Sequence, residues 1–188
     1  MSLRTFIALD LEEYILDGLC KAQGELADPV DKVKWVERVN LHVTLKFLGD
    51  VAEDRINDVC MLIREAAATV GAFDYDVRGL ECTPSHGPLR MVWGNIDDPS
   101  GLMAVLHEQL DAALASMGFR EENRQFRPHI TVARIKRVQN AAVFRAAVRT
   151  YEDFEFGVAH GDEVIAYTST LTDEGPIYTP LCRAQIGS

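Results

Sequence analysis

The chain has few cysteines and no long apolar run. Its four cysteines are scattered, without a CxxC pair or a neighbouring histidine: Cys20, Cys60, Cys82 and Cys182. This spacing favours neither a zinc site nor a disulfide framework, so we interpret all four as reduced thiols. No run approaches the length of a membrane span, and Asp10 interrupts an N-terminal run too short for a signal peptide. We therefore expect a cytoplasmic protein that does not associate with a membrane.

Basic side chains are also scarce. Lysine and arginine number 19 against 29 acidic residues, which gives a net charge of −10. Since a broad nucleic-acid surface depends on many contacts between basic side chains and phosphates, this composition excludes one. A few local arginines could still bind one nucleotide or the end of a strand. The hydrophobic content of 47% is sufficient for a core.

No linker rich in proline, glycine or serine divides the 188 residues, so we expect a single domain. Apolar spacing predicts helices over residues 12–27, 53–70, 98–117 and 140–151. Strands are predicted over residues 4–11, 33–36, 40–49, 73–82, 90–95, 127–134, 154–159, 163–171 and 177–185. This alternation indicates an α+β protein.

One strand-like segment carries a polar pattern that recurs later in the chain. Residues 40–49 read NLHVTLKFLG, and strand alternation places His42 and Thr44 on the same face, about 7 Å apart. The second copy lies in RPHITVAR, where His129 lies 87 residues after His42 and is followed by Thr131. These HxT motifs, at residues 42–45 and 129–132, predict two similar lobes whose motif strands lie near their junction.

Two histidines and two threonines suit displacement at phosphorus. Histidine gives or takes a proton near neutral pH, so a facing pair can act as base and acid in one turnover. Threonine hydroxyls could bind the phosphate oxygens, and a guanidinium would offset the developing charge. One imidazole would deprotonate the nucleophile and the other would protonate the leaving oxygen. This scheme requires neither a metal nor a cofactor.

The remaining notable side chains have simpler interpretations. We predict surface or structural roles for the other three histidines, His86, His107 and His160. Solvated surface positions are expected for three cations, Lys46, Arg127 and Arg137. Core positions are expected for both tryptophans, Trp35 and Trp93.

The sequence resembles the two-histidine (2H) phosphoesterases, in particular the RNA 2′,3′-cyclic phosphodiesterase branch, formerly called 2′-5′ RNA ligases (LigT/ThpR type). The matching segments are RTFIALDL, HVTLKFLG, RMVWGNI, FRPHITVAR and YTSTLTDEGPIYTPL, which span residues 4–182 in order. The resemblance implies one bilobal α+β domain over residues 1–188. Its two similar lobes of antiparallel sheet would have helices packed outside and the active-site cleft between them.

The resemblance also implies metal-independent hydrolysis of a 2′,3′-cyclic phosphate to a 2′-phosphate. His42 would be the proton donor and His129 the proton acceptor. Thr44, Thr131 and Arg134 would bind the phosphate, and Phe47 could pack against the terminal base. Strict alternation, however, places Phe47 and Arg134 on the opposite face from the histidines, so each needs a β-bulge, a strand end or a long reach to enter the cleft.

The expected partner is an RNA 3′ end or a nucleotide with a 2′,3′-cyclic phosphate, bound by a monomer. One alternative is an enzyme of the same superfamily that acts on a small cyclic phosphate, such as that of ADP-ribose, or that trims an RNA 3′ end. Another is a nucleotide-binding module without chemistry. A metal-binding role is weakest, because the two histidines lack adjacent carboxylate or thiolate ligands.

Overall fold

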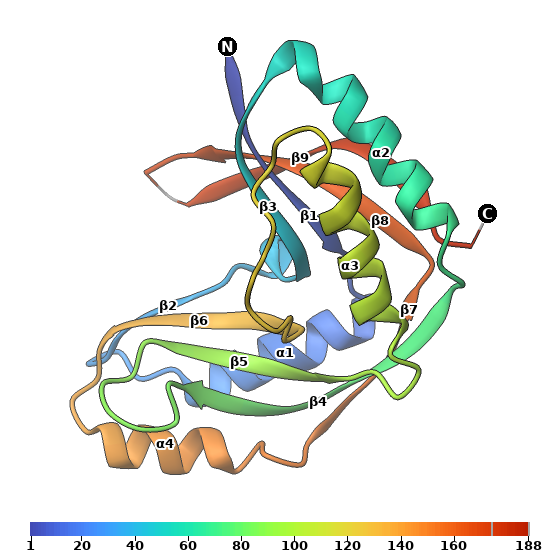
Figure 1. The fold of residues 1–188 in the computed structure, drawn as a ribbon. Coiled ribbons are helices and arrows are strands. Elements are labelled where there is room, and N and C mark those ends of the chain that lie inside the picture. Colours follow the sequence, from blue (N-terminus) through green and yellow to red (C-terminus); the bar gives the residue numbers. More distant parts are fainter. Residues whose placement is uncertain (174, 188) are drawn as a thin grey trace.

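The two HxT motifs lie on neighbouring strands at the centre of one curled antiparallel sheet (Figure 1). The computed structural model describes residues 1–173 and 175–187. Its strands are β1 (Ser2–Leu9), β2 (Lys32–Trp35), β3 (Val43–Ala52), β4 (Phe73–Thr83), β5 (Met91–Asp97), β6 (His129–Arg137), β7 (Glu155–Gly161), β8 (Glu163–Leu171) and β9 (Pro176–Gln185). The strand order is β7-β4-β5-β6-β3-β1-β8-β9, with β2 paired to β6.

The motif strands β3 and β6 join the two halves of this sheet. Their ladder consists of one residue pair, Val43 opposite Ile130, whereas the other ladders of the sheet are longer. Beyond that pair the halves diverge, with β2 and β6 below and β3 and β9 above in Figure 1. The prediction that the two motif strands lie at the junction is confirmed.

Four helices occupy the described part of the chain: α1 (Glu13–Leu26), α2 (Ile56–Ala68), α3 (Leu102–Ala115) and α4 (Ala141–Arg149). Helix α2 packs against α3 and β9, while α1 packs on β7 and α4 on β4. Helices α2 and α3 begin three and four residues later than the predicted starts at residues 53 and 98. Residues 53–55 form a 3-10 turn before α2, and the Asp98 carboxylate accepts hydrogen bonds from the amides of Ser100, Gly101 and Met103 before α3.

The interpretation of all four cysteines as reduced thiols is wrong for one pair. Cys60 of α2 and Cys182 of β9 form a disulfide, with Cα atoms 6.0 Å apart and 122 residues of separation. Packing of α2 on β9 brings them together, which no local spacing could indicate. Cys20 and Cys82 are free. Within the described residues, we find no helix long and apolar enough to cross a membrane.

Lys46 is not a surface cation as predicted, because its side chain is only 1% exposed. Its ammonium group donates to the Asp111 carboxylate of α3 and, at 2.9 Å, to the carbonyl of Arg120. Burial by itself would raise the pKa of Asp111, but the hydrogen bonds from Lys46 and the Glu122 amide outweigh it and hold the pKa below its ordinary value. The pair therefore fastens β3 to α3 and to the segment that follows α3.

Replacing Lys46 with Met should lower the free energy of unfolding by about 3–5 kcal/mol, because a mostly buried carboxylate loses its partner. Chemical denaturation followed by circular dichroism measures this change. The matched control is Lys21→Met, which removes an exposed lysine that contacts Glu25 at 4.0 Å and should cost less than about 0.5 kcal/mol. Equal losses in the two variants would contradict a special role for the buried pair.

Candidate active site

The two motif histidines are held by the same local hydrogen bond. Nδ1 of His42 lies 2.8 Å from the carbonyl oxygen of Asn40, and Nδ1 of His129 lies 2.9 Å from that of Arg127. A carbonyl only accepts hydrogen bonds, so we assign the proton of each neutral ring to Nδ1. Each ring therefore has its lone pair on Nε2. Both histidines can take or give a proton at Nε2 without losing the bond that orients them.

A β-bulge occurs at the same position in both motifs. Along β3, Ile7 pairs with Lys46 and Ala8 with Thr44, so Leu45 has no partner on β1. Along β6, Val92 pairs with Ala133 and Trp93 with Thr131, which leaves out Val132. Leu45 and Val132 are each three residues after the motif histidine. The repeated sequence pattern is thus also a repeated irregularity of the backbone.

The bulges bring Phe47 and Arg134 to the face that carries the threonines. Two consecutive buried residues follow each threonine, after which Phe47 and Arg134 are exposed. Each extra residue reverses the alternation from that point on. Of the alternatives predicted for these two residues, the structure shows the β-bulge at both positions.

Both bulged carbonyl groups have hydrogen-bond partners from the helices. The Leu45 carbonyl accepts from Nδ1 of His107 on α3 at 2.9 Å. The Val132 carbonyl accepts from Nε2 of Gln23 on α1 at 3.1 Å and from the Val36 amide at 3.0 Å. These contacts explain why His107 and Gln23 are buried polar residues. His107 therefore has a structural role, as predicted.

A single pocket of about 520 Å³ collects five of the six predicted site residues, His42, Thr44, Phe47, Thr131 and Arg134. His129 is not among the residues that line it. Its ring belongs to the same strand face as Thr131, two residues away, and it lies close enough to His42 to lower the pKa of that imidazole. The structure thus gathers five of the six predicted residues around one hollow, with His129 on the strand face that carries Thr131.

His42 lies among aromatic rings. Its imidazole centroid is 4.9 Å from the ring of Phe6 and 5.5 Å from that of Tyr178, which it meets edge to face. Burial lowers the pKa of His42, and the positive charge of a protonated His129 would lower it further, while Asn40 and Asp10 act in the opposite direction. Nε2 of His42 is 2.9 Å from the Thr44 hydroxyl. Sequence patterns did not indicate this aromatic surround.

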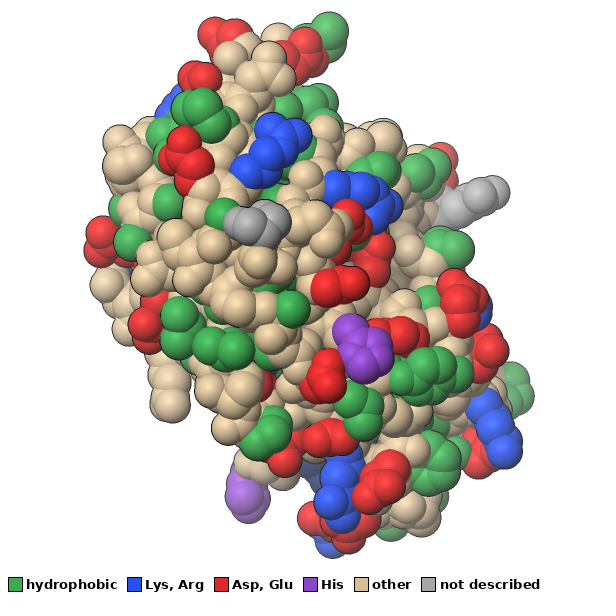
Figure 2. All heavy atoms as spheres, turned by 90° about the vertical axis from the view of Figure 1, so that its right-hand side faces the viewer, with side chains coloured by type: hydrophobic (Ala, Val, Ile, Leu, Met, Phe, Trp, Pro, Cys, Tyr) green, Lys and Arg blue, Asp and Glu red, His purple; other side chains and the backbone are tan. Residues whose placement is uncertain are grey.

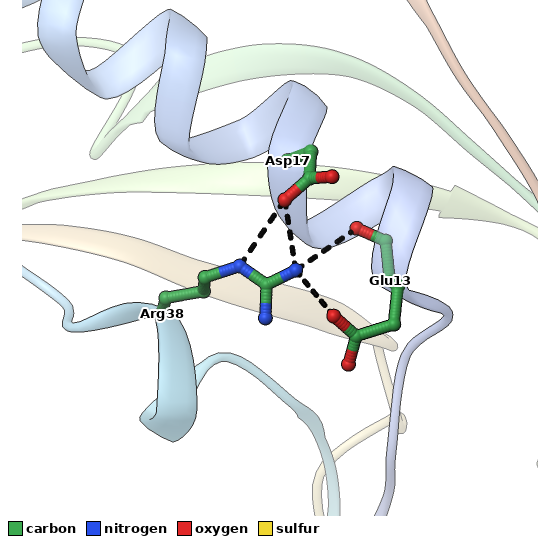
Figure 3. A network of polar contacts seen from close by, with 3 residues as sticks. All are labelled: Glu13, Asp17 and Arg38. Carbon is green, nitrogen blue, oxygen red and sulfur yellow. Dashed lines mark hydrogen bonds and ion pairs between the residues drawn. The ribbon is translucent and has the colours of Figure 1, made fainter.

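The carbonyl that orients His42 belongs to a short 3-10 turn, Arg38–Asn40, which is fastened on two sides. The Arg38 guanidinium donates to the carboxylates of Glu13 and Asp17 on α1 (Figure 3). The Asn40 side chain donates to the Pro176 carbonyl of β9 at 3.0 Å. The turn thus ties the position of His42 to α1 and β9.

His129 rests on Trp93 of β5, whose ring centroid is 3.8 Å away. Trp93 is only half-buried and is not part of the hydrophobic core, so the prediction of a core position is wrong for it. Trp35 lines the pocket as well as packing on the core. Burial is also the main cause that lowers the pKa of His129. The guanidinium groups of Arg127 and Arg134 lower it further, and Glu81 and the Arg127 carbonyl act in the opposite direction.

The pocket is more cationic than the molecule around it. Arg4, Lys34 and Arg134 line it, and Glu37 is its one acidic lining residue among those described. Carboxylate side chains, by contrast, are spread over the outer side where α2 ends, as Figure 2 shows. Within residues 1–173 and 175–187, we find no group of three or more histidine, cysteine, aspartate or glutamate side chains placed to hold a metal ion. The site suits a small anionic ligand.

Comparison with known proteins places this arrangement in a family. The family model described as the 2′-5′ RNA ligase superfamily matches residues 18–161. An RNA 2′,3′-cyclic phosphodiesterase from Methanothermobacter thermautotrophicus is 34% identical over 181 residues, which cover 96% of this chain and 97% of the relative.

Solved structures agree with this match. The protein TT0787 of Thermus thermophilus superimposes with a TM-score of 0.83 at 26% identity and 98% coverage of both chains. Escherichia coli LigT complexed with 3′-AMP has the same fold, with a TM-score of 0.77 at 23% identity and full coverage of both chains. Since the family model spans most of the chain and the archaeal relative aligns almost end to end, this protein belongs to the 2′-5′ RNA ligase superfamily.

Proposed function

We propose that this protein is an RNA 2′,3′-cyclic phosphodiesterase that hydrolyses a cyclic phosphate terminus to a 2′-phosphate by two-histidine acid–base catalysis. The observation that supports this most strongly is the matched pair of imidazoles, each oriented through Nδ1 so that its lone pair lies on Nε2. Relatives named for this activity align over nearly the whole chain.

In the proposed reaction, water attacks phosphorus in line with the bond to the 3′-oxygen. Nε2 of His129 takes a proton from the water as its oxygen bonds to phosphorus. The bond from phosphorus to the 3′-oxygen breaks, and Nε2 of His42 donates a proton to that oxygen. The products are a 2′-phosphate and a free 3′-hydroxyl. Proton exchange with solvent then restores His42 to its protonated form and His129 to its neutral form.

The hydroxyls of Thr44 and Thr131 and the Arg134 guanidinium are proposed to bind the non-bridging phosphate oxygens. Thr44 suits this role because its hydroxyl already contacts Nε2 of His42 at 2.9 Å. When His42 is protonated, that hydroxyl can accept from Nε2 and donate to the phosphate. Arg134 enters the pocket without an ion-pair partner among the described residues, so its charge is available to the anion.

Binding of the phosphate also resolves a difficulty with His42. A general acid must be protonated, yet burial lowers the pKa of this imidazole. The negative charge of the cyclic phosphate would favour the imidazolium form and raise that pKa in the complex. The substrate thus helps to protonate its own acid catalyst.

Phe47 is proposed to pack against the terminal base, since its side chain lines the pocket and is 66% exposed. The partner is accordingly an RNA 3′ end or a nucleotide with a 2′,3′-cyclic phosphate. We further propose that residues 1–188 act as one bilobal domain, as a monomer in the cytoplasm. The continuous sheet across the β3–β6 junction supports the single domain.

Replacing either catalytic histidine with alanine should lower kcat by about 10²- to 10⁴-fold, because each variant lacks one proton-transfer partner. The assay is hydrolysis of an RNA oligonucleotide that ends in a 2′,3′-cyclic phosphate, with EDTA present and the product identified by phosphorus NMR. His86→Ala is the matched control, since that histidine lies in an exposed turn. A His42 or His129 variant with more than half of the wild-type rate would remove that residue from the mechanism.

The same assay separates the alternatives. A wild-type protein that is folded but inactive on the oligonucleotide would next be tested on the cyclic phosphate of ADP-ribose. Turnover there would indicate a small-molecule phosphodiesterase. Nucleotide binding without turnover of either substrate would instead indicate a binding module.

The pH dependence of kcat/KM should be bell-shaped with its maximum below pH 6.5. The reaction requires one protonated and one neutral imidazole, and both pKa values lie below the ordinary value of 6.5 in the free protein. Activity therefore falls on the alkaline side as the acid loses its proton and on the acidic side as the base gains one. Initial rates at low substrate across pH 4–9 measure the profile, and a maximum above pH 7 would contradict it.

A further inference from the structure

Trp93 makes the closest aromatic contact with a motif histidine. Its indole and the His129 imidazole lie 3.8 Å apart between ring centroids, with 19° between their planes. Trp93 is also paired with Thr131 across the β5–β6 ladder. Both rings therefore project from neighbouring strands whose relative position is set by backbone hydrogen bonds.

His42 has a different surround. Phe6 lies 4.9 Å from it with the planes tilted by 31°, and Tyr178 meets it edge to face at 84°. Among the described residues, His129 is the one catalytic candidate with an aromatic ring stacked nearly parallel on its face. Each histidine thus has the same hydrogen bond from Nδ1 at the edge of its ring, whereas the aromatic residue that contacts the face of the ring differs.

Arg127 connects the edge and the face of the His129 ring. Its carbonyl oxygen accepts from Nδ1 of His129 at 2.9 Å, and its guanidinium carbon lies 5.3 Å from the centre of the Trp93 ring. The same guanidinium pairs with Glu81 of β4, the residue opposite Trp93 in the β4–β5 ladder. The predicted surface cation Arg127 is thus fastened at its side chain, which steadies the carbonyl that orients His129.

We propose that Trp93 is a positioning residue for the general base, holding the His129 imidazole by its face while the Arg127 carbonyl holds it by its edge. The inference rests on the proposed function, because it assigns Trp93 a part in that reaction. Trp93 is not among the residues that line the pocket, so it acts through the His129 ring. Its Nε1 is buried and has no hydrogen-bond partner within the described residues, so the indole contributes its ring face rather than its N–H.

The indole face also stabilises the imidazolium form of His129 against the neighbouring positive charges. When the ring takes a proton from water it becomes a cation, which the guanidiniums of Arg127 and Arg134 and a protonated His42 disfavour. Glu81 favours the cation, and so does the electron-rich face of an indole, the best of the aromatic rings for this purpose. Trp93 therefore both orients the base and stabilises the form that the base reaches during the reaction.

The test compares Trp93→Leu and Trp93→Phe with a control, Phe154→Leu. Leucine keeps an apolar side chain but removes the ring face, whereas phenylalanine keeps a weaker one. Phe154 meets Tyr151 and Phe156 edge to face and, within the described residues, contacts no histidine ring. The readouts are kcat and KM on the cyclic-phosphate oligonucleotide and the pKa of His129 from proton NMR of its Cε1–H signal.

Trp93→Leu should lower kcat by about 10- to 100-fold, since a misplaced catalytic group has effects of this size, with KM changed by less than about threefold. The pKa of His129 should fall, and its Cε1–H signal should lose the ring-current shift of the indole. Trp93→Phe should recover most of kcat, and Phe154→Leu should match the wild type. Unchanged kcat and pKa in Trp93→Leu, or equal losses in Phe154→Leu, would overturn the proposal.

Two further outcomes are informative. If Trp93→Leu fails to fold, the test uses Trp93→Phe. Because the phenyl face attracts a cation less strongly than indole does, the pKa of His129 in this variant should be lower than in the wild type. An unchanged or higher pKa would overturn the inference. If the wild-type protein hydrolyses no cyclic phosphate, the proposed function fails, yet the NMR titration still decides whether Trp93 holds and tunes His129. The two failures are therefore distinguishable.

Discussion

The site depends on one backbone irregularity that occurs twice, the bulge three residues after each motif histidine. Without it, alternation would bury Phe47 and Arg134 on the helix side of the sheet and leave the threonines without either neighbour. A bulge frees a carbonyl group, and a free buried carbonyl is costly. His107 of α3 and Gln23 of α1 supply the missing donors. Two helices thus maintain the local backbone geometry on which the pocket depends.

The single Val43–Ile130 pair brings the two bulged strands together. Both residues are fully buried, and each is the residue between the histidine and the threonine of its motif. Because they face the core, their neighbours on either side lie on the opposite face of the sheet, and three of these, His42, Thr44 and Thr131, line the pocket. The two halves then differ in the side chain that follows the bulge and lines the pocket, since Phe47 supplies an apolar surface and Arg134 a positive charge. A repeated backbone pattern therefore supports an asymmetric site, which suits the proposed packing of a base on Phe47 and binding of a phosphate by Arg134.

Electrostatics adds a second asymmetry. The chain is strongly acidic, yet the pocket is lined by Arg4, Lys34 and Arg134, so the local field favours a small anion while the outer surface repels a long polyanion. Burial makes both imidazoles poor cations in the free protein. In the proposed mechanism, a bound phosphate compensates for this at His42, and the indole of Trp93 does so at His129. The two proposed proton carriers thus share the same hydrogen bond at Nδ1 but would stabilise the imidazolium form by different means.

The sequence by itself determined the α+β class, nearly every helix and strand, and the pairing of the two motifs at the junction. Periodicity and the repeated HxT pattern are local signals, and strand alternation converts them into a shared face for His42 and Thr44 and for His129 and Thr131. Only the tertiary structure decided which side chains are buried by neighbouring helices and strands and which distant residues they contact. Lys46 was predicted to be a surface cation, but α3 covers it and supplies Asp111. Trp93 was assigned to the core, although β6 places His129 on its face, and Cys60 meets Cys182 only because α2 packs on β9. These contacts join residues far apart in the chain, so their physical cause lies in packing, which no local pattern records.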